Sequence, residues 1–433
     1  MNLRQRLQSD SYDGYAYSYP HKTAYRAIEP SLPLSEVWAD EDKDNLFLYV
    51  HLPFCEMRCG FCNLFTTVRP GESFVDKTLA GLYTQIEMVA SQVKPKGVAQ
   101  AAIGGGTPSF LSCEQLEQLF SVLDKNWPLR LGEVPLSLEV SPATVNPEKL
   151  ALLKQLGVNR LSMGVQSFLK EDLAALRRPT LGADIDQVCR WIKDTGFPVF
   201  NLDLIYGSEG QDKTRWERSL DAALRWEPEE IYIYPLYVGK LTNLDRLNRY
   251  PGEQRRALYY QAKERLLSAG YQQLSMRLFR LPNVTQDNDY CCQQDGMVGL
   301  GPGARSYTKA LHYSTDYAVG QPGVRAIISA FADMDYSRVH YGAALNEEEQ
   351  KRRFVIKSLL RLDGLCKQHY KEEFGTDVLA DLPELHELFD LELGSNSQGR
   401  VTLTTEGLAY SDTIGPWLYS NSVRQGMKEF EFQ

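Results

Sequence analysis

The chain has 433 residues, of which 43% are hydrophobic and 24% are charged, and its formal net charge is −9. This length allows one large hydrophobic core, or a large core with a smaller domain. The acidic balance argues against a protein that binds nucleic acid through a broad basic surface, but it allows a local basic pocket for a small acidic ligand.

The N-terminal residues MNLRQRLQSDSYDG contain arginines with no apolar segment behind them, so we do not expect a secretory signal. We also expect no membrane span, because no run of about 18 apolar residues occurs. Eight cysteines in so long a chain are too few for a disulfide scaffold. These features predict a cytoplasmic protein.

Residues 1–40 show no clear periodicity, and we expect them to form an arm on the main body. From residue 45 onward, short β-rich runs alternate with helical stretches. The predicted strands are 45–51, 99–105, 136–140, 160–165, 199–205 and 230–236, and the predicted helices are 74–94, 115–124, 147–156, 171–177 and 184–195. Such alternation is typical of an α/β fold with a parallel sheet covered by helices. Six units favour a partial, TIM-like (β/α)6 barrel, with a closed eight-unit barrel and an open doubly wound sheet as alternatives.

The C-terminal part carries different signals. GQPG at 320–323 is typical of a linker, and Asn346 is a good N-cap with Glu349 three residues later. The segment GRVTLTTEG at 399–407 predicts a hairpin strand. We therefore expect an N-terminal arm (1–40), a barrel with an extension (41–320) and a small, winged-helix-like α+β domain (321–433).

Three cysteines follow the first predicted strand in HLPFCEMRCGFCN, namely Cys55, Cys59 and Cys62. Thiolates are soft ligands for zinc or iron–sulfur clusters. A closed zinc site requires four ligands, and His51 is the nearby candidate for the fourth. Three close cysteines with one open position suit a [4Fe–4S] cluster whose fourth iron binds a ligand. The pair Cys291 and Cys292 is a further candidate for the neighbourhood of the site.

A glycine-rich turn, IGGGTPS at 103–109, follows the second predicted strand. Glycines allow a close approach of the backbone, and the N–H groups of such a turn can bind a carboxylate. Parallel strands bring their carboxyl ends to one edge of the sheet, so this turn should lie beside the cysteines.

The cysteine spacing, with Phe61 before the last cysteine, resembles the signature of the radical S-adenosylmethionine (SAM) superfamily. The wider sequence is similar to the branch that contains oxygen-independent coproporphyrinogen III oxidase and the haem chaperones. The matching segments are LYVHLPFC (48–55), GGGTPS (104–109), LEVSP (138–142), GVNRLSMGVQSF (157–168), NLDLIYG (201–207), GLGPGARS (299–306) and VTLTTEG (401–407).

This resemblance implies a set of cofactor-binding residues. The cluster would be held by Cys55, Cys59 and Cys62. SAM, in one or two molecules, would be bound by Tyr49, Phe61, Gly105, Gly106, Thr107, Glu139, Gln166, Arg178 and Asp203. No catalytic acid or base is implied.

The residue types agree with these roles, although simpler explanations exist. Glu139 and Asp203 are acids inside apolar strands, where a carboxylate needs a cationic partner such as SAM. A salt bridge to a neighbouring arginine would serve equally well. Arg178 has Arg177 as an alternative, and Tyr49 is also compatible with an ordinary strand position.

Within the branch, the chain resembles the haem-utilisation subgroup that includes anaerobilin synthase, in the segments SYPHKTAYR (18–26), GFCNLFT (60–66), DGMVGLGPGARSYT (295–308) and LYSNSVRQGM (418–427). It has Leu64 where the oxidases have a further cysteine, and Arg305 where the haem chaperones have a histidine. The subgroup implies an anaerobic, haem-degrading radical SAM methyltransferase that opens the ring and releases iron. The related oxidase and a haem chaperone without turnover remain alternatives.

The same resemblance implies haem as the substrate and reduced flavodoxin or a flavin reductase as the electron donor, with no nucleic-acid or membrane partner. A haem site needs cations for the propionates. The candidates in the arm are His21, Lys22 and Arg26. A further candidate is Arg305 in the segment GLGPGARS (299–306), which we call the late glycine turn. His21 is also a candidate ligand of the haem iron.

Overall fold

The computed structural model describes residues 2–9, 12, 14–16, 18–180, 182–252, 254–284 and 296–431. Six parallel strands form the centre of one large sheet, in the order in which they occur along the chain. They are β2 (Leu46–Leu52), β5 (Val98–Gly105), β6 (Leu136–Val140), β7 (Arg160–Gln166), β8 (Val199–Tyr206) and β9 (Glu230–Pro235). All six correspond to strands predicted from the sequence, and the partial α/β barrel is confirmed.

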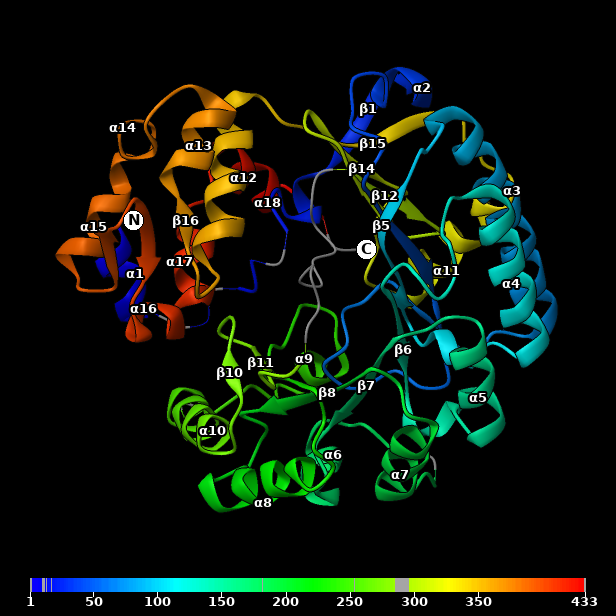
Figure 1. Ribbon diagram of the computed structural model, residues 1–433, viewed down its shortest axis with the longest axis horizontal. Coiled ribbons are helices and arrows are strands. Elements are labelled where there is room, and N and C mark those ends of the chain that lie inside the picture. Colours follow the sequence, from blue (N-terminus) through cyan, green and yellow to red (C-terminus); the bar gives the residue numbers. More distant parts are fainter. Residues whose placement is uncertain are drawn as a thin grey trace.

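Helices cover the outer face of this curved sheet (Figure 1). They are α3 (Glu72–Val93), α4 (Cys113–Asn126), α5 (Pro147–Gln155), α6 (Lys170–Ala175), α7 (Ile185–Thr195), α8 (Lys213–Leu224) and α10 (Arg255–Ser268). Their apolar faces and the strands share one large core, in which Leu119, Leu161 and Leu220 are fully buried. This burial leaves the inner face of the sheet as the surface on which polar side chains can gather.

The large sheet continues beyond the six strands on both sides. Next to β2 lie β12 (Met297–Leu300), which is parallel to it, and then β13 (Arg305–Tyr307), β14 (Leu311–Ser314), β15 (Arg338–Ala344) and β1 (Arg26–Pro33). Next to β9 lie β11 (Leu278–Arg280) and β10 (Gln272–Gln273). Among the described strands the sheet therefore has two ends, β1 and β10, and is open rather than a closed eight-unit barrel.

The boundaries expected after residues 40 and 320 separate strands that belong to this one sheet. Within the residues assigned to the arm, β1 pairs with β15 at the sheet edge. Residues 321–344, which we placed in the C-terminal domain, form α11 (Gln321–Phe331) and β15. The segment GQPG is thus the start of a helix rather than a linker.

A second, smaller core lies in the C-terminal part. It contains α12 (Glu347–Leu359), α13 (Lys367–Phe374), α17 (Ser411–Trp417), α18 (Asn421–Lys428) and the three strands β16 (Leu365–Cys366), β17 (Gly394–Ser397) and β18 (Arg400–Leu403). The N-terminal helix α1 (Leu3–Ser9) packs against α17 in this core, as Figure 1 shows. Among the described residues, no helix has the length and apolar character needed to cross a membrane.

Candidate active site

Seven positions in five of the central strands are partly open while their neighbours in the strand are buried. These positions are Tyr49 in β2, Glu139 in β6, Gly164 and Gln166 in β7, Asp203 in β8, and Tyr232 and Tyr234 in β9. Gly164, Asp203 and Tyr232 are direct neighbours in the register of three adjacent strands. Because helices cover the outer face, we assign these side chains to the inner face, which we call the inner chamber.

The cysteines lie on the loop that follows β2. Cys55 ends the short strand β3 (Phe54–Cys55), which pairs with β4 (Thr67–Val68), and the N–H of Cys62 donates to the carbonyl oxygen of Cys59 at 3.1 Å. The pKa of Cys55 is raised to about 12, first by burial and then by the nearby thiols of Cys62 and Cys59. Burial and Cys59 also raise the pKa of Cys62. The three thiols therefore lie close enough together to interact with one another.

The alternative zinc site loses its proposed fourth ligand. The Nε2 atom of His51 lies 3.0 Å from the carbonyl oxygen of Phe65, and its Nδ1 atom lies 3.1 Å from the hydroxyl of Tyr49. A carbonyl oxygen only accepts, so Nε2 donates there and the Tyr49 hydroxyl donates to Nδ1.

The glycine turn at the end of β5 is packed so tightly that larger residues would not fit. A Cβ atom on Gly105, whose φ is +113°, would lie 2.6 Å from the His51 ring, and one on Gly106 would lie 2.4 Å from the carbonyl oxygen of Phe54. The backbone N–H of Gly105 donates to the Oε2 atom of Glu139 at 3.2 Å. The hydroxyl of Thr107 approaches the Sγ atom of Cys55 at 3.8 Å. The turn thus joins the cysteines to the chamber.

The two carboxylates of the chamber are suited to a cationic ligand. Burial raises the pKa of Glu139 to about 7, with Asp203 as the next cause, and burial also raises the pKa of Asp203. Asp203 accepts hydrogen bonds from Asn201 at 2.9 Å and Ser162 at 3.4 Å. The nearby Arg160 pairs instead with Glu230 at 2.8 Å. Among the described residues, neither carboxylate forms a salt bridge with a Lys or Arg, although the charge of Arg160 lowers the pKa of both. Buried carboxylates of this kind need a cationic partner.

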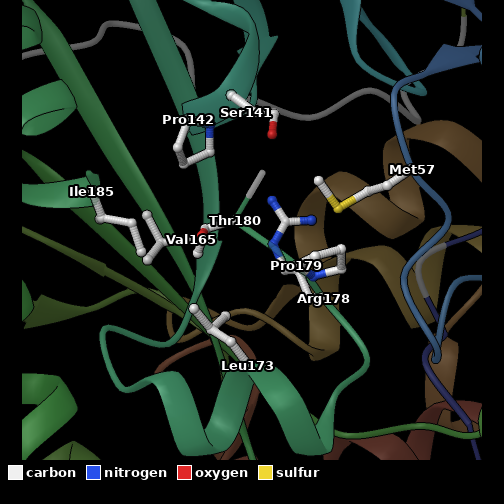
Figure 2. Close-up of a pocket in the computed structure, with 10 residues that line it drawn as sticks. Met57, Ser141, Pro142, Val165, Leu173, Arg178, Pro179, Thr180 and Ile185 are labelled. Carbon is white, nitrogen blue, oxygen red and sulfur yellow. The ribbon is translucent and has the colours of Figure 1, made fainter. Parts of the chain in front are cut away.

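Arg178 connects the cysteines with a small pocket between β6 and β7. Its Nη1 atom donates to the Sγ atom of Cys59 at 2.9 Å, and its Nη2 atom donates to the carbonyl oxygen of Gly164. In Figure 2 its guanidinium lies between Val165 and Met57, below Ser141. Arg177, the alternative considered from the sequence, is exposed on the surface. Gln166 lies at the end of β7 with a φ of +72°.

Phe61 belongs to an apolar cluster that reaches the far side of the chamber. Together with Tyr234 and Val238 it packs on the buried side chains Leu176, Ile205, Leu236 and Leu244. The loop that carries Cys59 and Cys62 is thereby joined to β9. The sequence analysis did not single out Tyr232 and Tyr234, although the alternation in EIYIYP is the signal of an inner strand face.

A cationic cluster, formed by Lys22 and Arg305, lies near the histidines His21 and His51. Burial lowers the pKa of His21 to about 3 and that of His51 to about 4, and the charges of both Lys22 and Arg305 contribute. Arg305 donates to the Oγ atom of Ser18 in the arm at 3.2 Å, and Lys22 lies 4.1 Å from the centre of the Tyr317 ring. The arm and the late glycine turn thus meet beside the cysteine loop.

Of the remaining sequence candidates, Arg26 lies elsewhere. Arg26 donates to the carbonyl oxygen of Gly426 and lies 3.7 Å from Glu429. It therefore binds the α18 segment and does not belong to the cationic cluster. Cys291 and Cys292 lie outside the described residues.

Comparisons with known proteins agree with this architecture. A model of the radical SAM superfamily matches residues 49–223, and a model of the HemN C-terminal domain matches residues 345–410. The chain is 28% identical to the heme chaperone HemW of Bacillus subtilis, over 86% of this chain and 98% of that protein. It is 30% identical to HemW of Mycobacterium tuberculosis strain H37Rv, over 60% of this chain and 69% of that protein. It is 27% identical to the oxygen-independent coproporphyrinogen III oxidase of Pseudomonas aeruginosa, over 90% of this chain and 88% of that protein.

A solved structure extends the likeness to the fold. The coproporphyrinogen III oxidase HemN from Escherichia coli matches with a TM-score of 0.77 and 23% sequence identity, over 95% of this chain and 100% of that chain. The expectation of a haem-degrading methyltransferase is wrong by these comparisons, because the relatives are named as heme chaperones and coproporphyrinogen oxidases.

Proposed function

The chain belongs to the radical SAM superfamily, in the branch of the coproporphyrinogen III oxidases and heme chaperones, and we propose that it is an enzyme acting on a cyclic tetrapyrrole with acidic side groups. Its cofactors are a [4Fe–4S] cluster and SAM. A bound cluster, reduced by an external electron donor, would supply the electron for the reductive cleavage of SAM. The protein contributes binding, orientation and electrostatics.

We assign the cofactor-binding roles to residues around the chamber. Cys55, Cys59 and Cys62 would hold the cluster, and Glu139 and Asp203 would face the positive groups of SAM. Arg178, placed beside the cysteines, would pair with the carboxylate of SAM. The remaining assignments of the sequence analysis are Tyr49, Phe61, Gly105, Gly106, Thr107 and Gln166.

The positions of opposite charges around the site support an anionic substrate. Two buried carboxylates lie in the chamber, whereas the cations Lys22 and Arg305 lie on the arm side of the cysteine loop. A cationic cofactor and an anionic substrate would therefore be held on different sides. The acidic side groups of a tetrapyrrole fit the second position, as expected for relatives of chaperones and oxidases that handle haem or coproporphyrinogen.

A heme chaperone without turnover is the second candidate. His21 lies on the arm near Arg305, and its Nδ1 atom lies 2.8 Å from the hydroxyl of Thr23. An imidazole there could bind the haem iron. The matches to HemW over 98% of one relative and 69% of another support this candidate.

An anaerobic assay distinguishes these functions. The reconstituted protein is incubated with SAM, reduced flavodoxin or a flavin reductase as donor, and either haem or coproporphyrinogen III. An enzyme forms 5′-deoxyadenosine in proportion to a tetrapyrrole of altered mass. A chaperone retains one tetrapyrrole of unchanged mass for each chain. A protein that binds neither tetrapyrrole contradicts both functions.

A further inference from the structure

Three tyrosine rings contact one another in sequence at the β9 side of the inner chamber. Tyr232 and Tyr234 are stacked, with ring centroids 5.8 Å apart and an angle of 13° between the ring planes. Tyr15 of the N-terminal segment meets Tyr234 edge-on at 6.3 Å. Tyr15 is 38% exposed, and both β9 tyrosines are partly open. We call these three residues the tyrosine wall.

The wall borders both cofactor-binding regions. Asp203 is the direct register neighbour of Tyr232, and its charge helps to raise the pKa of Tyr234 and of Tyr232, for which burial is the first cause. Tyr234 shares an apolar cluster with Phe61, which precedes Cys62. A ligand lying on the wall would therefore lie next to the SAM-binding carboxylates and the cysteine loop.

Tyr15 is held in place by an ion pair that links three parts of the chain. The guanidinium of Arg277 lies 3.8 Å from the centre of the Tyr15 ring and donates to the two oxygens of Asp412 at 2.5 and 2.6 Å. Asp412 also accepts from Tyr237, and its backbone carbonyl accepts from the N–H of Gly14 at 3.1 Å. This clamp joins the arm to α17 and to the bend before β11, so Tyr15 is positioned before a ligand binds.

We propose that the tyrosine wall binds the flat face of a conjugated tetrapyrrole, a haem or a porphyrin, in preference to the puckered, non-conjugated porphyrinogen form. The inference rests on the proposed function and narrows its substrate class. Aromatic rings gain from offset or edge-on contact with another flat π-system, and a ring interrupted by saturated bridges offers no such face. The cations Lys22 and Arg305 would bind the acidic side groups of either form. The preference for the conjugated form over the porphyrinogen would therefore come from the tyrosine wall.

Coproporphyrin III and coproporphyrinogen III provide the test, because they carry the same acidic side groups and differ in conjugation. Binding to the intact protein is measured by anaerobic equilibrium dialysis in the dark. We expect coproporphyrin III to bind about 10-fold more tightly than coproporphyrinogen III. Equal affinity, or tighter binding of the porphyrinogen, would overturn the inference while leaving the proposed function intact. Binding of neither ligand would refute the proposed function itself.

Variants locate the preference on the wall. Tyr234→Ala and Tyr15→Ala should each weaken coproporphyrin III binding about 3- to 10-fold while changing coproporphyrinogen III binding less than about 2-fold. Tyr234→Phe and Tyr15→Phe keep the ring and should retain the preference. Tyr250, which is 56% exposed on the surface, provides the control Tyr250→Ala. Equal weakening of both ligands would indicate a merely structural role and would overturn the assignment to the wall.

Discussion

The Nη1 atom of Arg178 lies 2.9 Å from the Sγ atom of Cys59, which places a guanidinium directly beside the cysteine loop. A planar guanidinium can bind a carboxylate through two parallel hydrogen bonds, whereas a lysine ammonium cannot reproduce that geometry. We therefore predict that Arg178→Lys weakens SAM binding about 10- to 100-fold, as expected for loss of a charged hydrogen bond. Equilibrium dialysis with the reconstituted protein measures this change. The exposed neighbour provides the control Arg177→Lys, and an equal effect of both variants would contradict the assignment.

Glu139 gives a prediction for the pH dependence of stability. Its pKa is raised from 4.5 to about 7 in the folded chain. Below about pH 4.5 the carboxyl is protonated in both states and has no effect, and between pH 4.5 and 7 ionisation increasingly favours the unfolded chain. In the absence of SAM, Glu139→Gln should therefore stabilise the protein at pH 8 by on the order of 1–3 kcal/mol, and the gain should fall away toward pH 5.

Urea unfolding at pH 5 and pH 8 checks this prediction. The exposed Glu117 in the middle of α4 supplies the control Glu117→Gln, for which no such change between the two pH values is expected. The same Glu139→Gln variant should bind SAM more weakly at pH 8, because it lacks the carboxylate. A variant that is less stable than the wild type at pH 8 would contradict the burial argument.

Much of the centre of the fold could be predicted from the sequence because its determinants are local. The cysteine spacing, the glycine turn, and the single acids within LSLEV and NLDLI each identify a strand end or an inner face without reference to other segments. The Tyr232–Tyr234 alternation carries the same kind of signal, but an apolar strand rich in tyrosine is equally compatible with a fully buried position.

The outer parts could not be predicted because they depend on contacts between distant residues. The edge pairing of β1 with β15 joins Arg26 to Gly342, and nothing in either segment specifies the other. The ion pair of Arg277 with Asp412 spans 135 residues, and it is this contact that places Tyr15 on the wall. Arg26 appeared equivalent to Lys22 in the sequence, yet its ion pair with Glu429 removes it from the cationic cluster.

The clamp itself predicts a loss of stability. Arg277 and Asp412 are both buried, so Asp412→Ala leaves a buried guanidinium without its carboxylate. Breaking such a pair costs about 3–5 kcal/mol, which should appear as a lower urea midpoint. The pair Lys77–Asp333, whose side chains are 58% and 74% exposed, is the control, and Asp333→Ala should cost less than about 1 kcal/mol. Equal losses in the two variants would show that the clamp is not a main support of the arm.

Gly105 gives a prediction for the turn beside the cysteines. In Gly105→Ala the new Cβ would lie 2.6 Å from the His51 ring, at a φ of +113° that side chains rarely adopt. We expect a stability loss of about 1–3 kcal/mol together with weaker SAM binding, since His51 and the Glu139 contact must both shift. Gly252→Ala has open space around its Cβ and should change neither property. Normal SAM binding by Gly105→Ala would contradict the close packing of the turn.

The most direct test of the account is the yield of 5′-deoxyadenosine under anaerobic, reducing conditions from reconstituted wild-type protein and from Cys55→Ala, Cys59→Ala and Cys62→Ala, each with and without haem or coproporphyrinogen III. We predict that the wild type binds iron and forms 5′-deoxyadenosine at a rate that a tetrapyrrole increases. Each cysteine variant should lose both properties, whereas Cys113→Ala, outside the loop, should retain them. A cysteine variant that still cleaves SAM, or a wild type whose cleavage no tetrapyrrole affects, would contradict the account.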